Sequence, residues 1–187
     1  MNVILMGFRC TGKSTAGRRL AEELGAPFFD TDELIEQRTG RLIARIVREQ
    51  GWPAFRAAER DVIRELAGTD RGVISLGGGT VCDPDNVADL KAHGVFVWLS
   101  ARPEAIVGRM VRDEDRGTER PSLTGEPLIK EMQTVMDERE PLYRQLADIV
   151  IDTTGIPVEG VVEAIRTALR ERFAETERTG DGPGENR

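Results

Sequence analysis

The strongest constraint on this 187-residue chain is the segment Gly-Phe-Arg-Cys-Thr-Gly-Lys-Ser at residues 7–14, which fits the phosphate-binding loop pattern G-x-x-x-x-G-K-[ST] without a mismatch. An apolar run at residues 3–6 precedes it and a helix-like stretch follows it. Glycines let the backbone turn tightly, so successive N–H groups point at phosphate oxygens beside a helix N-terminus. The pattern predicts a nucleoside triphosphate site, with Lys13 at the β- and γ-phosphates and Ser14 on Mg²⁺. The alternative is a glycine turn followed by an ordinary surface lysine.

Further apolar runs alternate with helix-like stretches, at residues 27–29, 72–76, 95–99 and 149–151. Near-continuous apolar strands separated by helices predict an α/β fold, in which helices cover both faces of a parallel sheet. Helices are expected at about residues 13–24, 33–49, 53–67, 84–92, 102–113, 127–147 and 157–173. Ligands of such sheets collect at the carboxyl ends of the strands. Those ends are predicted to carry the phosphate loop, then Asp30-Thr31-Asp32, then Gly77-Gly78-Gly79.

Composition excludes several functional classes. The chain is 39% hydrophobic and 32% charged, which predicts one soluble domain, and it has neither an apolar run of about 20 residues nor a secretory signal. A net charge of −7 argues against a nucleic-acid surface. Cys10 and Cys82 do not resemble a disulfide framework, and with His93 as the only histidine a His/Cys zinc site is excluded. We therefore expect a cytoplasmic monomer with small-molecule partners and without nucleic-acid or membrane partners.

The two aspartates after the second strand predict metal and acceptor chemistry. We expect Asp30 to support Mg²⁺, through water, and Asp32 to orient an acceptor hydroxyl and take its proton. The alternative is that Asp30 or Thr31 only caps the following helix.

Arginines beside glycines are candidates for binding anionic substrates. Gly77-Gly78-Gly79 would allow a ligand to approach the backbone closely, although a tight strand-to-helix turn accounts equally well for it. Arg56 with Glu59 at i,i+3 predicts a preorganised carboxylate receptor, with a surface ion pair as the alternative. The charged stretch 112–125 is expected to be a mobile loop whose arginine closes over a phosphoryl group. The rival candidates for that role are Arg112, Arg116 and Arg120 in this stretch and Arg139 beyond it, and the alternative is ordinary solvated charge.

Six segments in this order resemble the shikimate kinase family over about residues 2–170. They are GFRCTGKST (7–15), FDTDELIEQRTG (29–40), PAFRAAE (53–59), ISLGGGTV (74–81), ERPSL (119–123) and EREPLYR (138–144). The resemblance implies a P-loop NTPase three-layer sandwich, nucleoside-monophosphate-kinase-like, with a five-stranded parallel sheet flanked by helices. It also implies that ATP phosphorylates the 3-hydroxyl of shikimate, in aromatic amino-acid biosynthesis. We expect a single domain at 1–174, with an acceptor-binding region at about 31–60 and a lid at about 112–125, and a disordered tail at 175–187.

Residue roles also follow from the resemblance. It implies that Lys13, Asp32 and Arg120 are catalytic, and that Ser14 binds Mg²⁺ with support from Asp30. The implied ATP-binding residues are Gly7, Arg9, Cys10, Thr11, Gly12, Lys13, Ser14, Thr15, Arg109, which packs on adenine, and Arg120. The implied acceptor-binding residues are Asp32, Arg56, Gly77, Gly78, Gly79 and Arg139, with Glu59 supporting Arg56. Two departures stand out: Cys10 lies where many members have glycine, and the lid is longer and more acidic than is usual, with Asp113, Glu114 and Asp115 in succession.

Two other functions are weighed against this one. A kinase of another small hydroxylated acid, such as gluconate, would share the phosphate loop and lid but has less use for Arg56, the glycine run and Arg139 together. A nucleotide-dependent switch would usually carry Asn-Lys-x-Asp after a later strand, where this chain has Leu99-Ser100-Ala101 and Asp152-Thr153-Thr154.

Overall fold

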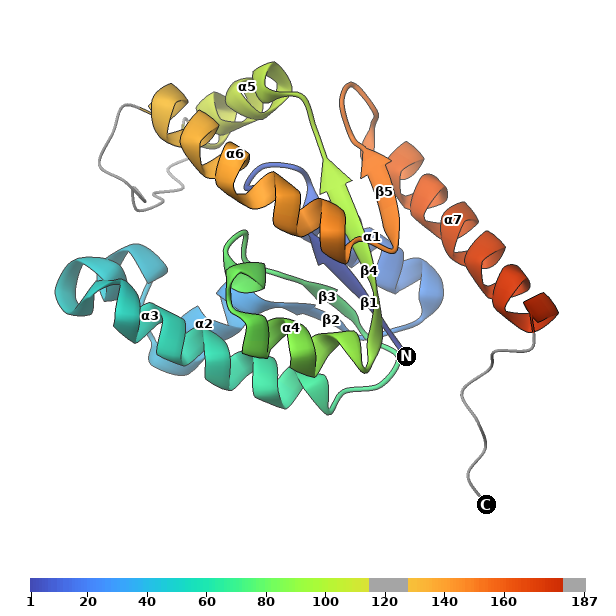
Figure 1. Ribbon diagram of the computed structural model, residues 1–187. Coiled ribbons are helices and arrows are strands. Elements are labelled where there is room, and N and C mark those ends of the chain that lie inside the picture. Colours follow the sequence, from blue (N-terminus) through green and yellow to red (C-terminus); the bar gives the residue numbers. More distant parts are fainter. Residues whose placement is uncertain (115–127, 180–187) are drawn as a thin grey trace.

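The computed structural model describes residues 1–114 and 128–179, built around one sheet of five parallel strands in the order β2-β3-β1-β4-β5 (Figure 1). The strands are β1 (Asn2–Met6), β2 (Phe28–Asp30), β3 (Val73–Ser75), β4 (Gly94–Ser100) and β5 (Ile149–Asp152). The helices are α1 (Lys13–Leu24), α2 (Thr31–Thr39), α3 (Ile43–Ala67), α4 (Pro84–Lys91), α5 (Pro103–Glu114), α6 (Leu128–Leu146), α7 (Val158–Thr179) and the short 3₁₀ helix η1 (Thr80–Cys82). The predicted parallel α/β fold is confirmed.

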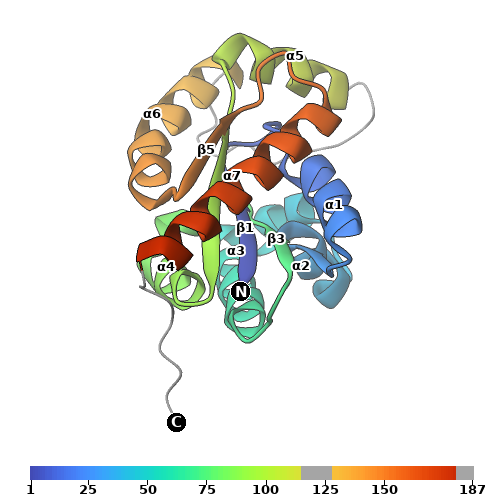
Figure 2. The same ribbon diagram turned by 90° about the vertical axis from the view of Figure 1, so that its right-hand side faces the viewer.

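Alternation along the central strands produces three layers. Ile4 and Met6 of β1 join the core on one side of the sheet, with α2, α3, α4 and part of α6. Leu5, between them, joins the core on the other side, with α1 and α7. Successive strand side chains point to opposite faces, so a strand that is buried on both faces carries mainly apolar side chains in both directions. Figure 2 shows α1 and α7 together on one face of the sheet.

Glycines end the helices where the sequence predicted one continuous helix. The expected helix at 33–49 is wrong, because α2 ends at Thr39 and Gly40 adopts a left-handed conformation (φ 63°). A new helix, α3, begins at Ile43 and runs to Ala67, with a kink at Gly51 (φ 81°) just before Pro53. Glycine adopts positive φ with little cost, and proline removes a helical hydrogen bond, so both positions interrupt regular helix.

The first part of the predicted tail is helical. The helix α7 continues to Thr179, so residues 175–179 of the expected tail at 175–187 are helical, and 180–187 lie outside the described residues. This segment lacks apolar anchors but holds good helix formers up to Gly180, and propensity is enough to extend a helix that is already packed. None of the helices within residues 1–114 and 128–179 is long and apolar enough to cross a membrane.

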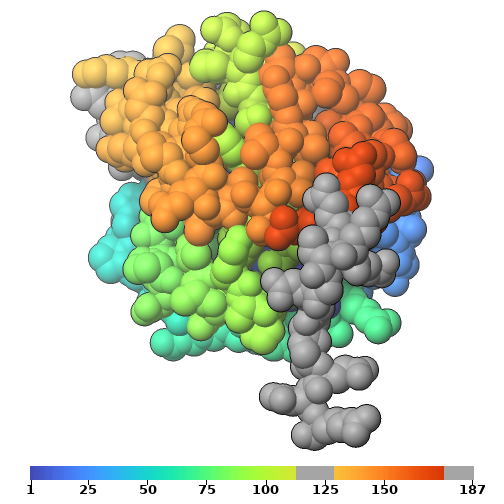
Figure 3. Space-filling model, turned by 45° about the vertical axis from the view of Figure 1, so that its right-hand side comes forward, coloured from blue at the N-terminus to red at the C-terminus, as the bar shows by residue number. Residues whose placement is uncertain are grey.

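Strand register brings three chemistry-bearing segments to one edge of the sheet. Asp30 of β2 is level with Ser75 of β3, and Ser75 is level with Leu5 of β1. The phosphate loop, the start of α2 and the glycine run therefore leave adjacent strands at the same height. On the outside of the molecule, the surface of α6 meets that of α4 (Figure 3), and Lys91 donates to the Leu146 carbonyl (3.1 Å).

Candidate active site

The phosphate loop lies between β1 and the N-terminus of α1. Gly7 (φ 144°) lies so close to β4 that an added Cβ would be 2.3 Å from the Leu99 carbonyl oxygen, and Gly12 (φ 96°) precedes the first turn of α1. Lys13 is only 8% exposed, and its Nζ donates to the carbonyl oxygens of Gly7 (2.9 Å) and Phe8 (2.8 Å). An ammonium group thus lies inside a loop at a helix N-terminus, which is a site for anions.

Cys10 takes a glycine-like conformation within this loop. Its φ is 59°, in the left-handed region that L-residues populate at a cost of about 1–2 kcal/mol. Its carbonyl accepts a hydrogen bond from Arg109 Nη1 (3.1 Å), which helps to hold it there. The backbone at this position would therefore suit glycine, the residue that the resemblance leads us to expect there.

Arg109 joins the phosphate loop to the segment that follows β5. Its guanidinium donates to Thr153 Oγ1 (3.0 Å) and to the Thr153 carbonyl (2.7 Å), in addition to the Cys10 carbonyl. The Thr153 hydroxyl also donates to the Thr11 carbonyl (3.1 Å). Arg109 lines the cavity over the phosphate loop, and its contact with adenine stays a prediction. Sequence reasoning gave Thr153 no role here.

Asp30 caps α2 with one carboxylate oxygen and contacts Ser14 with the other, so the predicted cap is present and the role at Mg²⁺ stays a prediction. One carboxylate oxygen accepts from the backbone N–H groups of Asp32 (3.0 Å) and Glu33 (3.4 Å), which caps α2. The other oxygen accepts from Ser14 Oγ (2.6 Å). A cap therefore holds the carboxylate in place beside the serine. Because hydroxyl and carboxylate oxygens suit Mg²⁺, this pair has the chemistry of a magnesium site.

Two cavities meet at this edge of the sheet. The first lies over the phosphate loop and is bordered by the predicted residues Arg9, Cys10, Gly12, Lys13, Ser14, Thr15, Asp30 and Arg109, with Arg112. The second is bordered by the predicted residues Asp32, Arg56, Gly77, Gly78, Gly79 and Arg139, with Glu59 and three aromatic side chains. Arg9, Asp32 and Gly78 border both. Asp32 is thus placed where a phosphate donor and an acceptor would adjoin.

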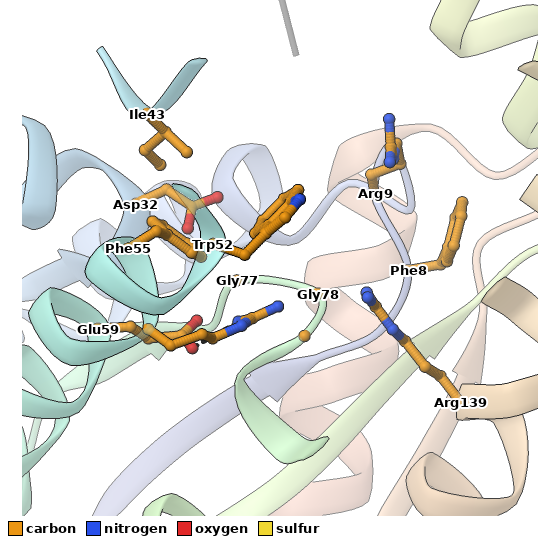
Figure 4. A pocket seen from close by; sticks show the side chains of 12 residues that line it. Phe8, Arg9, Asp32, Ile43, Trp52, Phe55, Glu59, Gly77, Gly78 and Arg139 are labelled. Carbon is orange, nitrogen blue, oxygen red and sulfur yellow. Dashed lines mark hydrogen bonds and ion pairs between the residues drawn. The ribbon is translucent and has the colours of Figure 1, made fainter. Parts of the chain in front are cut away.

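Two arginines of the second cavity lie close to the glycine run, since a Cβ added to Gly79 would be 2.4 Å from Arg56 Nη2 and one added to Gly78 would be 3.5 Å from Arg139 Nη1. In Figure 4, Arg139 extends from α6 on one side, while Asp32, Trp52 and Phe55 lie on the other, with Gly77 and Gly78 between them. Figure 4 also shows Arg9 and Phe8 of the phosphate loop on the Arg139 side.

Arg56 is held by a buried partner. Its Nη1 donates to Glu59 Oε2 (2.6 Å), and Glu59 is 1% exposed. The guanidinium carbon lies 5.1 Å from the ring centroid of Phe55 and 5.7 Å from that of Trp52, within the range of cation–π attraction. Because Glu59 is buried, the pair is not the solvated surface pair offered as the alternative, and the role of Arg56 as a carboxylate receptor stays a prediction.

Tyr143 supports the opposite wall, and sequence reasoning assigned it no function. Its hydroxyl donates to the Gly78 carbonyl, and its ring stacks on Trp98 with centroids 6.0 Å apart. Burial raises the pKa of this hydroxyl above its ordinary value, while the positive charge of Arg139 acts in the opposite direction. The quoted segment EREPLYR contained it, but nothing local indicates that its hydroxyl reaches a glycine far away in sequence.

The raised pKa leads to a direct spectroscopic prediction, because Tyr143 is the only tyrosine in the chain. Native protein should show no tyrosinate absorbance as the pH passes 10.0, the ordinary pKa, whereas urea-unfolded protein should titrate there. A group whose pKa is raised by folding keeps its full stabilising effect below its unfolded pKa and loses it as pH rises toward the folded value. Ionisation of the native protein at the ordinary pKa would contradict the burial of the hydroxyl.

A second unpredicted contact connects the phosphate loop to α6. Arg9 Nη2 lies 3.3 Å from Glu131 Oε1, and Glu131 is almost fully buried. Phe8 packs nearby against Ile106 of α5 and Met132 of α6. The two helices that flank residues 115–127 are therefore packed on the phosphate loop. Arg116, Arg120 and the rest of the lid from Asp115 lie outside the described residues.

Comparison with known proteins shows which family this chain resembles. The family model for shikimate kinase matches residues 9–170. A shikimate kinase of Syntrophus aciditrophicus is 42% identical over 181 residues, covering 92% of this chain and 93% of that protein. A shikimate kinase of Nitratidesulfovibrio vulgaris is 44% identical over 167 residues, covering 89% and 94%. The chain belongs to the shikimate kinase family.

Solved structures agree with this membership. The shikimate kinase of Acinetobacter baumannii in complex with shikimate superposes with a TM-score of 0.84 at 33% identity, covering 91% of this chain and 93% of that one. A gluconokinase of Sinorhizobium meliloti superposes with a TM-score of 0.60 at 19% identity, which shows a shared fold alone. The predicted P-loop kinase fold is thereby confirmed, and membership in the shikimate kinase family favours the first of the three functions considered from the sequence.

Proposed function

We propose that this chain transfers the γ-phosphoryl group of ATP to the 3-hydroxyl of shikimate, giving shikimate 3-phosphate and ADP, on the route to aromatic amino acids. The observation that carries the proposal is that Arg56 and Arg139 border one cavity together with Gly77-Gly78-Gly79, next to a cavity over the phosphate loop. A small anionic acceptor and a polyphosphate could occupy the two cavities side by side.

The acceptor's carboxylate would lie between the two arginines. Guanidinium groups bind carboxylates through paired, charge-assisted hydrogen bonds, and Arg56 is already oriented by Glu59. In a chain with a net charge of −7, such local positive charge is needed to bind an anion. We assign binding of the carboxylate to Arg56 and Arg139. We assign backbone contacts with the acceptor to Gly77, Gly78 and Gly79.

On the donor side, the phosphates would bind the loop amides and Lys13. Ser14 and Asp30 would hold Mg²⁺, which commonly binds one or two protein oxygens, the phosphates and water. Among residues 1–114 and 128–179, no three His, Cys, Asp or Glu side chains gather around a metal position, so any richer protein cage would need other residues. Bound Mg²⁺ would neutralise charge on the β- and γ-phosphates.

Asp32 would position the acceptor hydroxyl and receive its proton. As the new oxygen–phosphorus bond forms, the bond between the γ-phosphorus and its bridging oxygen breaks, and ADP leaves with that oxygen. Phosphoryl transfer depends mainly on alignment and charge neutralisation, so orientation is the larger part of this role. We assign transition-state stabilisation to Lys13 and, on sequence grounds alone, to Arg120.

The wider organisation is also proposed. Residues 1–174 would form the kinase domain, with acceptor binding at about 31–60 and a lid at about 112–125. We also propose a monomer, because the sequence has no long apolar face that demands a partner. ATP as substrate and the unbridged thiols of Cys10 and Cys82 favour the cytoplasm.

The glycine run offers a test of the carboxylate assignment. A Cβ added to Gly79 would lie 2.4 Å from Arg56 Nη2, whereas its backbone (φ −103°) suits any residue. Gly79→Ala should therefore displace the guanidinium rather than strain the chain, and raise KM for shikimate by about tenfold or more. KM for ATP should stay within about twofold.

Gly68→Ala, where the atom nearest to the added Cβ would be 3.5 Å away, is the control. Equal changes in both Michaelis constants would mean that Arg56 does not bind the acceptor's carboxylate.

The function itself is tested by following ADP release from Mg-ATP by the purified chain with no acceptor, shikimate, quinate or gluconate. Release that depends on shikimate supports the proposal. Release with gluconate instead would favour the other kinase function, and nucleotide binding without any acceptor-dependent release would favour a switch.

A further inference from the structure

Glu59 is held at both of its carboxylate oxygens. Oε2 accepts from Arg56 (2.6 Å), and Oε1 accepts from Thr80 Oγ1 (2.7 Å). Glu59 is 1% exposed and Thr80 is fully buried. A buried carboxylate needs a donor at each oxygen, because an unpaired one loses its hydration without compensation.

The position of Thr80 is itself fixed by backbone contacts. Its N–H donates to the Gly77 carbonyl (3.1 Å), which forms the turn after the glycine run, and its carbonyl accepts from Asn86 Nδ2 (3.3 Å). Asn86 is buried, and its Oδ1 accepts from Arg60 (3.2 Å), which also bonds Asp89 (2.6 Å). The hydroxyl is thus aimed at Glu59 by η1 and α4.

We propose that Thr80 is a positioning residue for the acceptor's carboxylate, acting through Glu59 on Arg56; this inference rests on the proposed function. With the Thr80 hydroxyl in place, one oxygen of Glu59 is occupied, and only the other is directed at Arg56. This leaves the rest of the guanidinium fork for the acceptor. Without the hydroxyl, Glu59 is free to rotate and to offer both oxygens to Arg56, which competes directly with the substrate's carboxylate.

The direct test compares Thr80→Val, which keeps the branched shape but loses the hydroxyl, with Thr80→Ser, which keeps the hydroxyl. Thr80→Val should raise KM for shikimate about tenfold, and leave kcat and KM for ATP within about twofold. Thr80→Ser should stay within about twofold of the parent. If the valine variant does not fold, as judged by its thermal unfolding, Thr80→Ala takes its place.

A double-mutant cycle separates positioning from general loosening of the site. In an Arg56→Ala background, Thr80→Val should change kcat/KM for shikimate by less than about twofold, because the group that it positions is absent. The same tenfold loss in both backgrounds, or no loss in the parent, would overturn the inference. Failure of the parent enzyme to phosphorylate shikimate would instead overturn the proposed function on which the inference rests.

Discussion

Lys13→Ala is expected to lower kcat on the order of a thousandfold or more, the largest effect of any single change in this chain. The ammonium group lies inside the loop, where it donates to the carbonyl oxygens of Gly7 and Phe8, and water has little access to it. When ATP binds, the same group would reach the β- and γ-phosphates. A positive charge held in a site with little water compensates strongly for the negative charge that develops during phosphoryl transfer.

The control is chosen from the same helix. Arg19 is 53% exposed, and its ion pairs are with Glu22 and Glu23 of the same helix. Arg19→Ala should therefore leave turnover within about twofold of the parent. Because Lys13 also ties two loop carbonyls, circular dichroism must show that Lys13→Ala is folded. A folded variant with near-normal turnover would contradict the assignment of the phosphate loop.

Arg139→Ala is expected to raise KM for shikimate by about a hundredfold, since truncating one partner of a desolvated charge pair costs about 2–5 kcal/mol. KM for ATP should change by no more than about threefold, because Arg139 borders the acceptor cavity and not the cavity over the phosphate loop. The split between the two Michaelis constants, from initial rates with each substrate varied, is the measurement.

Arg144 provides the matched control on α6. It is 70% exposed and pairs with Glu140 one turn earlier. Arg144→Ala should leave both Michaelis constants near those of the parent. A loss of binding shared equally by shikimate and ATP in Arg139→Ala would mean that Arg139 organises the whole cleft rather than the carboxylate.

The sheet could be predicted because each strand carries its own signal. Apolar runs mark all five strands, and the chemistry at three strand ends follows from topology alone. The break between α2 and α3 could not be predicted from the sequence. Gly40 lies within a pattern that otherwise continues as helix, and its left-handed conformation depends on how the two helices pack.

Most of the site contacts that could not be predicted from the sequence are hydrogen bonds between residues far apart in the chain. Thr80 is an ordinary residue after a glycine run, and only the fold places its hydroxyl on Glu59. Tyr143 and Thr153 likewise act on backbone groups far away in the chain. That Asp30 both caps α2 and accepts a hydrogen bond from Ser14 could not be predicted from sequence either, because each contact uses a different carboxylate oxygen.

The measurement that tests the central claim most directly is phosphorus NMR of the product made from shikimate and Mg-ATP. A monoester phosphorus coupled to the ring proton at the carbon that bears the 3-hydroxyl is the predicted result, with one ADP formed for each ester. Phosphate on another hydroxyl would mean that Arg56 and Arg139 hold the acceptor in a different orientation. Free phosphate without any ester would contradict the assignment of this chain as a shikimate kinase.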